Sequence, residues 1–104
     1  MGRIVIVGYK PKRGKNKEVR ALMKEHVAIL RREGLATDRE SILMEAKDGT
    51  IIEVFEWKSA QAIEAAHSNA VVHGMWKRFS EVCDYIPIGK IAESSQLFSE
   101  FTPF

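Results

Sequence analysis

Hydrophobic and polar positions along the chain follow two repeats, and each repeat predicts one kind of secondary structure. Residues 4–9 (IVIVGY) and 51–57 (IIEVFEW) are short runs rich in β-branched side chains, which are typical of strands. Residues 40–46 alternate between apolar and polar side chains, and the Asp48-Gly49 pair that follows favours a tight hairpin to the next strand. A last short strand is predicted over residues 85–91.

Two helices are predicted between these strands. Apolar residues recur at near-helical spacing from Lys17 to Leu30, and Gly34 ends this helix. Ser59 is the expected N-cap of the second helix, which Ser68-Asn69 interrupts or restarts. The resulting order is β-α-β-β-α-β, the split pattern of ferredoxin-like folds. The sequence therefore predicts an α+β fold with a four-stranded antiparallel sheet and two helices on one of its faces.

The other face of this sheet is expected to be apolar as well. Side chains alternate along a strand, so Ile4 and Ile6 point to one face while Val5 and Val7 point to the other. Four strands of about six residues present roughly 400 Å² per face. Leaving such a face in water forfeits about 10 kcal/mol, which is comparable with the stability of a whole domain. We therefore expect an obligate homodimer that packs sheet to sheet.

Composition narrows the remaining possibilities. A chain of 104 residues is expected to form a single domain, residues 1–104, with residues 93–104 as a tail that packs on the partner or over the pocket. The formal net charge of +2 is too small to indicate binding to nucleic acid or to an anionic membrane. The chain has one cysteine, no apolar run of membrane-spanning length and no signal-peptide pattern, so a cytoplasmic location is expected.

A stretch in the second half of the chain resembles a known family. An apolar strand ends in Glu56 and Trp57, the helix after it carries the AIEAAH sequence of Ala62–His67, a small polar break follows, and Trp76 stands three residues past His73. This arrangement is similar to the antibiotic biosynthesis monooxygenase-like family of dimeric α/β barrels. The resemblance implies a pocket between the sheet and the helices of each protomer. Members include cofactor-free oxygenases of polyphenolic substrates, haem-degrading enzymes and small proteins without an assigned reaction.

Five residues are the candidates for a site in such a pocket. His67 and His73 are the candidate catalytic residues, because an imidazole exchanges protons near neutral pH. Tyr9, Trp57 and Trp76 are the candidate substrate-binding residues, as walls for a flat aromatic ligand or as hydrogen-bond donors. Structural roles are the alternatives: His67 would hydrogen-bond the helix break at Ser68-Asn69 and help to hold it, Trp76 would be plain core with His73 beside it, Trp57 would simply pack, and Tyr9 would be half-exposed.

Several other chemistries are not expected. The haem-degrading branch needs an Asn in the first strand, which is absent here, and Ala66 and Trp76 stand approximately where that branch has Trp and His. No cofactor and no metal site are expected. The basic loop Lys10–Lys17 departs from a phosphate-binding loop in its spacing and is expected to be solvated. His26 and Cys83 fall on apolar stripes and are expected to be a satisfied core histidine and an inert core thiol.

Two functions of different classes remain open. The first is a cofactor-independent monooxygenase that acts on a small aromatic or conjugated substrate with an acidic C–H bond. The second is a non-catalytic dimeric domain that binds a small hydrophobic ligand or serves a stress or accessory role. A catalytic cavity is expected to hold at least two convergent polar groups. The presence of such groups would favour the monooxygenase over the binding domain.

Overall fold

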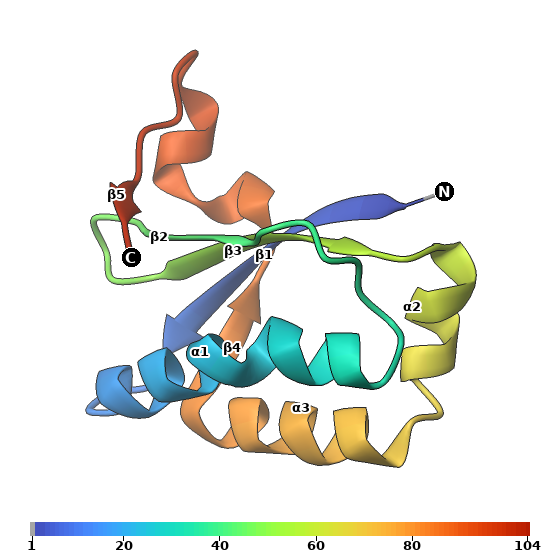
Figure 1. Cartoon of the computed structure of the whole chain (residues 1–104). Coiled ribbons are helices and arrows are strands. Elements are labelled where there is room, and N and C mark those ends of the chain that lie inside the picture. Colours follow the sequence, from blue (N-terminus) through green and yellow to red (C-terminus); the bar gives the residue numbers. More distant parts are fainter. Residues whose placement is uncertain (1) are drawn as a thin grey trace.

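One antiparallel sheet organises the computed structural model, which describes residues 2–104 (Figure 1). The sheet order is β4-β1-β3-β2-β5. Its strands are β1 (Arg3–Pro11), β2 (Ile42–Glu45), β3 (Ile51–Trp57), β4 (Cys83–Ile86) and β5 (Thr102–Pro103). The first four strands have the predicted ferredoxin-like arrangement, but the prediction of a four-stranded sheet is incomplete because β5 adds an edge strand beside β2.

Helices cover one face of this sheet (Figure 1). They are α1 (Asn16–Arg32), α2 (Ala60–Ala66) and α3 (Ala70–Val82). The predicted break of the second helix is present and separates α2 from α3, because the side chain of Asn69 accepts a hydrogen bond from the backbone of Val72 and caps a new helix. Together these two helices take the place of the single second helix of the predicted pattern.

The buried face of α1 explains how the helix sits on the sheet. Val19, Met23 and Leu30 follow one another at helical spacing, and each is at most 2% exposed. The helix ends just before Gly34, whose φ of 75° lies in the left-handed region that favours glycine. The predicted apolar stripe is therefore the surface that packs against the core.

The last predicted strand is shorter than expected. β4 ends at Ile86, before Pro87, which has no N–H to donate to a sheet. Two short 3₁₀ helices, η1 (Ile88–Lys90) and η2 (Ala92–Ser95), replace the end of that strand. They lie on the side of the sheet opposite α1 and α3 (Figure 1).

This C-terminal segment covers part of the outer sheet face. Ile91 and Phe101 pack in a cluster with Ile52, which is completely buried. The outer face is therefore less open than the strand patterns predict. Ile4 and Ile42 remain 57% and 56% exposed on the uncovered part.

The tail itself makes mixed contacts. The ring of Phe104 packs against the main core cluster and lies 4.6 Å from the guanidinium carbon of Arg20. Leu97 and Phe98 are highly exposed. The tail thus packs partly on its own sheet, and the contacts expected between residues 93–104 and a partner or the pocket stay a prediction.

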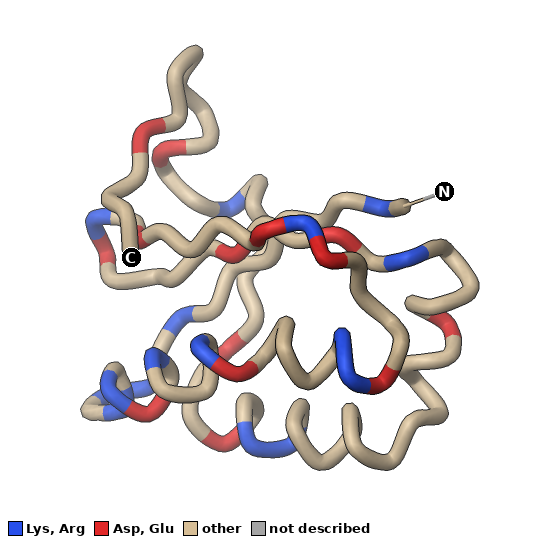
Figure 2. The backbone as a smooth tube through the Cα atoms, viewed as in Figure 1, with Lys and Arg blue, Asp and Glu red and all other residues tan. Residues whose placement is uncertain are grey.

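Charged residues are spread over the surface, with one local concentration of Lys and Arg at the start of α1 and in the loop before it (Figure 2). Residues 12–18 of this basic segment are exposed. The ammonium of Lys12 donates a hydrogen bond to the carbonyl of Ser80. None of the helices in residues 2–104 has the length and apolar character needed to cross a membrane.

Candidate functional site

A cavity of about 730 Å³ lies between the sheet and the helices. Its volume falls within the range of pockets that hold small organic ligands. Aromatic and aliphatic side chains form most of its wall, and a few polar groups interrupt them. The residues that line the cavity are Val5, Val7, Tyr9, His26, Phe55, Trp57, Ile63, His73, Trp76, Lys77, Ser80 and Tyr85.

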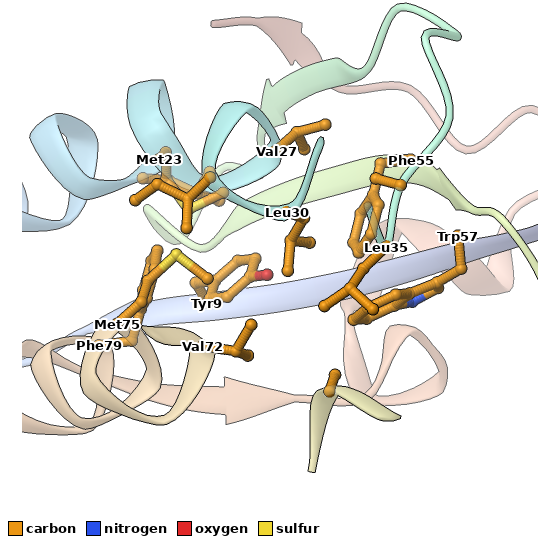
Figure 3. Packing of buried hydrophobic residues seen from close by; sticks show 14 of the residues in the cluster. Tyr9, Met23, Val27, Leu30, Leu35, Phe55, Trp57, Val72, Met75 and Phe79 are labelled. Carbon is orange, nitrogen blue, oxygen red and sulfur yellow. The ribbon is translucent and has the colours of Figure 1, made fainter. Parts of the chain in front are cut away.

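The alternation of side chains along β1 and β3 explains why several aromatic residues point into the cavity. Tyr9 lies at the inner face of β1, and Phe55 and Trp57 share the inner face of β3 because they are two residues apart. The ring centroids of Phe55 and Trp57 are 5.3 Å apart. Figure 3 shows the Tyr9 ring between side chains of α1, such as Leu30, and side chains of α3, such as Val72.

Two polar side chains, from β1 and α1, meet at a buried carboxylate of β3 behind this wall. The hydroxyl of Tyr9 donates a hydrogen bond of 2.9 Å to Oε1 of Glu53, and Nδ1 of His26 lies 2.8 Å from the same oxygen. Glu53 is 0% exposed. Tyr9 and His26 are the two members that reach the cavity. We call Tyr9, His26 and Glu53 the buried triad.

Sheet register brings the tyrosine to the carboxylate. Tyr9 pairs with Ile51, and Val7 pairs with Glu53, so Tyr9 and Glu53 are diagonal neighbours on the inner face. His26 reaches them from the buried side of α1. The same oxygen therefore receives two partners that lie far from it in the sequence.

The electrostatics of the triad follow from its burial. Removal from water and the nearby charge of Glu53 raise the pKa of Tyr9 well above its usual value, so its hydroxyl keeps its proton and donates. An ionised carboxylate can only accept hydrogen bonds, which assigns the proton on His26 to Nδ1. In the neutral imidazole, Nε2 is then the free acceptor. The arrangement can orient a base at the cavity wall, while the Tyr9 hydroxyl donates its proton to the carboxylate that holds this base.

The second carboxylate oxygen of Glu53 is unusual. Oε2 is buried and has no hydrogen-bond partner among residues 2–104. Buried polar atoms are normally paired, because an unpaired one costs about 1–3 kcal/mol. The triad therefore holds an unsatisfied acceptor close to the cavity.

Four of the five predicted site residues line the cavity, and His67 does not. Tyr9 and Trp57 are buried in the wall, while His73 is exposed and stacks on Trp76 with a centroid distance of 6.2 Å. Tyr9 is thus not the half-exposed residue of the structural alternative.

His67 is exposed instead, and its Nδ1 lies 2.9 Å from the carbonyl oxygen of Ile63. That contact is made within α2, to the residue four positions earlier, rather than to the helix break at Ser68-Asn69. The acid/base roles of His67 and His73 stay predictions.

Glu53 and His26 are the site residues that sequence reasoning missed. His26 was expected to be a buried, satisfied core histidine; it is 3% exposed and paired, but it also reaches the cavity. The available signal was in β3, where Glu53 shares the inner face with Ile51, Phe55 and Trp57. A carboxylate among core residues demands a polar partner, and a histidine on an apolar helix stripe is a suitable one.

Two further ionisable side chains, Cys83 and Tyr85, keep their protons at neutral pH. Burial raises the pKa of the Cys83 thiol to about 11, and the thiol lies 3.2 Å from the carbonyl oxygen of Phe79. Burial also raises the pKa of Tyr85 to about 12. Within residues 2–104, no group of three or more His, Cys, Asp or Glu side chains converges as a metal site requires.

Comparison with known proteins provides fold relatives. No family model matches the chain, and a sequence search of curated proteins finds no match. Rv0793 from Mycobacterium tuberculosis is similar in structure, with a TM-score of 0.65 and 18% identity over 83% of this chain and 89% of that one. SnoaB, a cofactor-independent oxygenase from Streptomyces nogalater, has a TM-score of 0.65 and 12% identity over 80% of this chain and 85% of that one.

Both likenesses extend over most of each chain, whereas the sequence identities are low. They show the fold alone: this chain shares an α+β, ferredoxin-like arrangement with these two proteins.

Proposed function

We propose that this protein is a cofactor-independent monooxygenase and that the cavity between sheet and helices is its active site. The observation that carries the proposal is the buried triad: His26 and Tyr9 reach an otherwise largely apolar wall, and both pair with Glu53. The likeness to SnoaB, a cofactor-independent oxygenase, supports the reaction class. The substrate is a small aromatic or conjugated molecule with an acidic C–H bond.

The chemistry begins with proton removal. Nε2 of His26 takes a proton from an activated CH₂ group, and the protonated imidazole stabilises the negative charge that develops on the substrate. The single hydroxyl proton of Tyr9 is donated to Glu53 and helps to hold that carboxylate in place. Glu53 holds the His26 ring in the required tautomer and stabilises its protonated form. Apolar walls exclude water and strengthen these interactions.

Oxygen is the oxidant. The substrate anion passes one electron to O₂, and the resulting radical and superoxide combine into a C–O–O⁻ peroxide. His26 returns its proton to the outer oxygen. Loss of the second C–H proton then breaks the O–O bond and forms a C=O group and water. The balance is one CH₂ group and one O₂ giving one C=O group and one H₂O, so the reaction needs no external reductant.

The protein works as a homodimer in this proposal. Ile6, Val54 and Ile42 form a row across three neighbouring strands of the outer face, since each pairs with the next in register. Ile6 and Ile42 are 48% and 56% exposed. A second copy packed on this row would bury it, and the exposed Leu97 and Phe98 of the tail are available for contacts with that copy.

A non-catalytic ligand-binding domain is the second candidate. It is favoured by the fact that Tyr9 and His26 both have Glu53 as their hydrogen-bond partner, as in a structural polar network. The two functions differ in oxygen consumption, because a binding domain takes up aromatic ligands without consuming O₂.

The direct experiment measures oxygen uptake with 1,8-dihydroxyanthrone, which has an acidic CH₂ group between two rings. The native protein is expected to consume oxygen faster than the protein-free solution, and His26→Gln is expected to lose about 10²–10⁴-fold of this rate. Lys24→Gln is the control and keeps the native rate, because Lys24 is exposed on α1 and does not line the cavity. Binding of the anthrone without oxygen uptake would favour the binding domain.

A further inference from the structure

The wall that α3 contributes to the cavity differs from the wall formed by the sheet. His73, Lys77 and Ser80 are spaced by four and three residues, so they share one face of α3. All three side chains are exposed. The two cavity residues of the triad, Tyr9 and His26, are at most 3% exposed. The cavity thus has a buried end at the triad and an open, polar rim on α3.

The rim of the cavity on α3 is positively charged. Lys77 carries a positive charge, and none of the described residues that line the cavity is Asp or Glu. The ion pairs found within residues 2–104 join Arg20 to Glu45, His26 to Glu53 and Arg39 to Glu56, so they leave the Lys77 ammonium free. Within ion-pair distance, therefore, no described carboxylate neutralises the rim.

The buried end of the cavity, unlike the rim, disfavours a negatively charged ligand group. The carboxylate of Glu53 lies behind Tyr9 and His26 and has a buried oxygen without a partner. A ligand group that is already anionic when it binds would be repelled there and attracted by the rim, whereas the charge formed in the proposed reaction is balanced by the proton that His26 takes up. An ionised acid on the ligand would then turn toward solvent, leaving the apolar part of the ligand between the aromatic walls.

We propose that the ligand of this cavity is a planar aromatic molecule with an acidic group, such as a carboxylate, that lies against Lys77 at the α3 rim. The inference rests on the proposed function for its assignment of the cavity as the active site. It adds the charge class of the substrate and its orientation. The C–H bond that reacts is at the end of the molecule remote from the acid.

Two probes of nearly equal shape test this preference. Anthraquinone-2-carboxylate is negatively charged at pH 7, whereas anthraquinone-2-carboxamide is neutral. Calorimetric titration of the native protein is expected to give a Kd for the carboxylate that is about two- to fivefold lower than for the amide, the size expected for an exposed ion pair. The ratio is expected to decrease at high salt.

Variants at one position assign the preference to Lys77. Lys77→Gln is expected to bring the two Kd values together while leaving amide binding unchanged, and Lys77→Glu is expected to favour the amide. Lys24→Gln is the control, since Lys24 is exposed on α1 and does not line the cavity. It keeps the native ratio. Equal binding of both probes by the native protein, or an unchanged ratio in Lys77→Glu, would overturn the inference.

The failures of the two proposals are distinguishable. If the amide binds and the anthrone consumes oxygen but no charge preference exists, the acidic-ligand inference is wrong and the proposed reaction stands. If neither anthraquinone binds, the cavity is not a site for flat aromatic ligands and both proposals are contradicted.

Discussion

Oε1 of Glu53 lies 2.8 Å from Nδ1 of His26, although the two residues are 27 positions apart in the sequence. Neither side chain is more than 4% exposed. A buried ionic or polar pair of this kind is poor evidence for stability, because desolvation offsets much of the attraction. Its position beside a ligand-sized cavity favours a functional role instead.

Replacing Glu53 with Gln tests how the pair works. A Gln amide can donate to Nδ1 of His26, so the proton of the imidazole moves to Nε2 and the base is lost. Oxygen uptake is expected to fall about 10²–10⁴-fold. The tautomer change is measured by ¹⁵N chemical shifts of the imidazole. Glu64→Gln, on the exposed side of α2, serves as the control. A native tautomer together with native activity in Glu53→Gln would remove Glu53 from the mechanism.

The raised pKa of Tyr9 predicts a dependence of stability on alkaline pH. An unfolded tyrosine ionises near pH 10. Because the folded state holds the Tyr9 proton to higher pH, the unfolded state binds fewer protons above about pH 10, and the free energy of unfolding decreases there as pH rises. Urea unfolding between pH 9 and 11 measures this slope.

Tyr9→Phe isolates the contribution of Tyr9, since Cys83 and Tyr85 also have raised pKa values. The variant is expected to show a shallower decrease than the native protein. An identical slope in both proteins would mean that Tyr9 titrates normally in the folded state.

Cys83 is expected to be unreactive in the folded protein. Its pKa of about 11 leaves little thiolate at pH 8, and its side chain is buried. Reaction with 5,5′-dithiobis(2-nitrobenzoic acid) is expected to be slow for the native protein and rapid after addition of guanidinium chloride. Rapid labelling without denaturant would show that β4 opens easily or that the thiol is not buried.

The strand arrangement was largely predictable from the sequence, and the places where prediction failed have physical causes. Alternation and the Asp48-Gly49 turn predicted β2 and β3, and the polar Asn69 predicted the break between α2 and α3. β5 was missed because Thr102–Pro103 is too short to show alternation. Packing of the C-terminal segment on Ile52 was missed because nothing in a local pattern says which face a tail will cover.

The site was predictable only in part, because residue types can be recognised in the sequence but contacts between distant residues cannot. Aromatic walls such as Trp57 and Trp76 stand out by residue type. The Glu53–His26 pair depends on the sheet register and on the direction of α1, and these are properties of the whole fold. The inner-face position of Glu53 was visible in the alternation of β3 and should have indicated a buried partner.

The exposed row on the outer sheet face predicts an interface. Ile6→Lys would place an unpaired charge in the proposed dimer interface, so the dimerisation Kd is expected to rise at least about tenfold. Val71→Lys is the matched control: Val71 is 51% exposed on α3 and remote from that face. Light scattering over a concentration series gives the mass. A native protein that stays monomeric at micromolar concentration would contradict the dimer.

The central claim is that His26, held by Glu53, removes a substrate proton so that the substrate itself can reduce O₂. Reaction of 1,8-dihydroxyanthrone under ¹⁸O₂ tests it most directly, with mass spectrometry of the product and the rate compared in native protein and His26→Gln. We predict one ¹⁸O atom in the new carbonyl group and a rate about 10²–10⁴-fold lower in the variant. Unlabelled product, hydrogen peroxide in place of water, or an unchanged rate in His26→Gln would contradict the account.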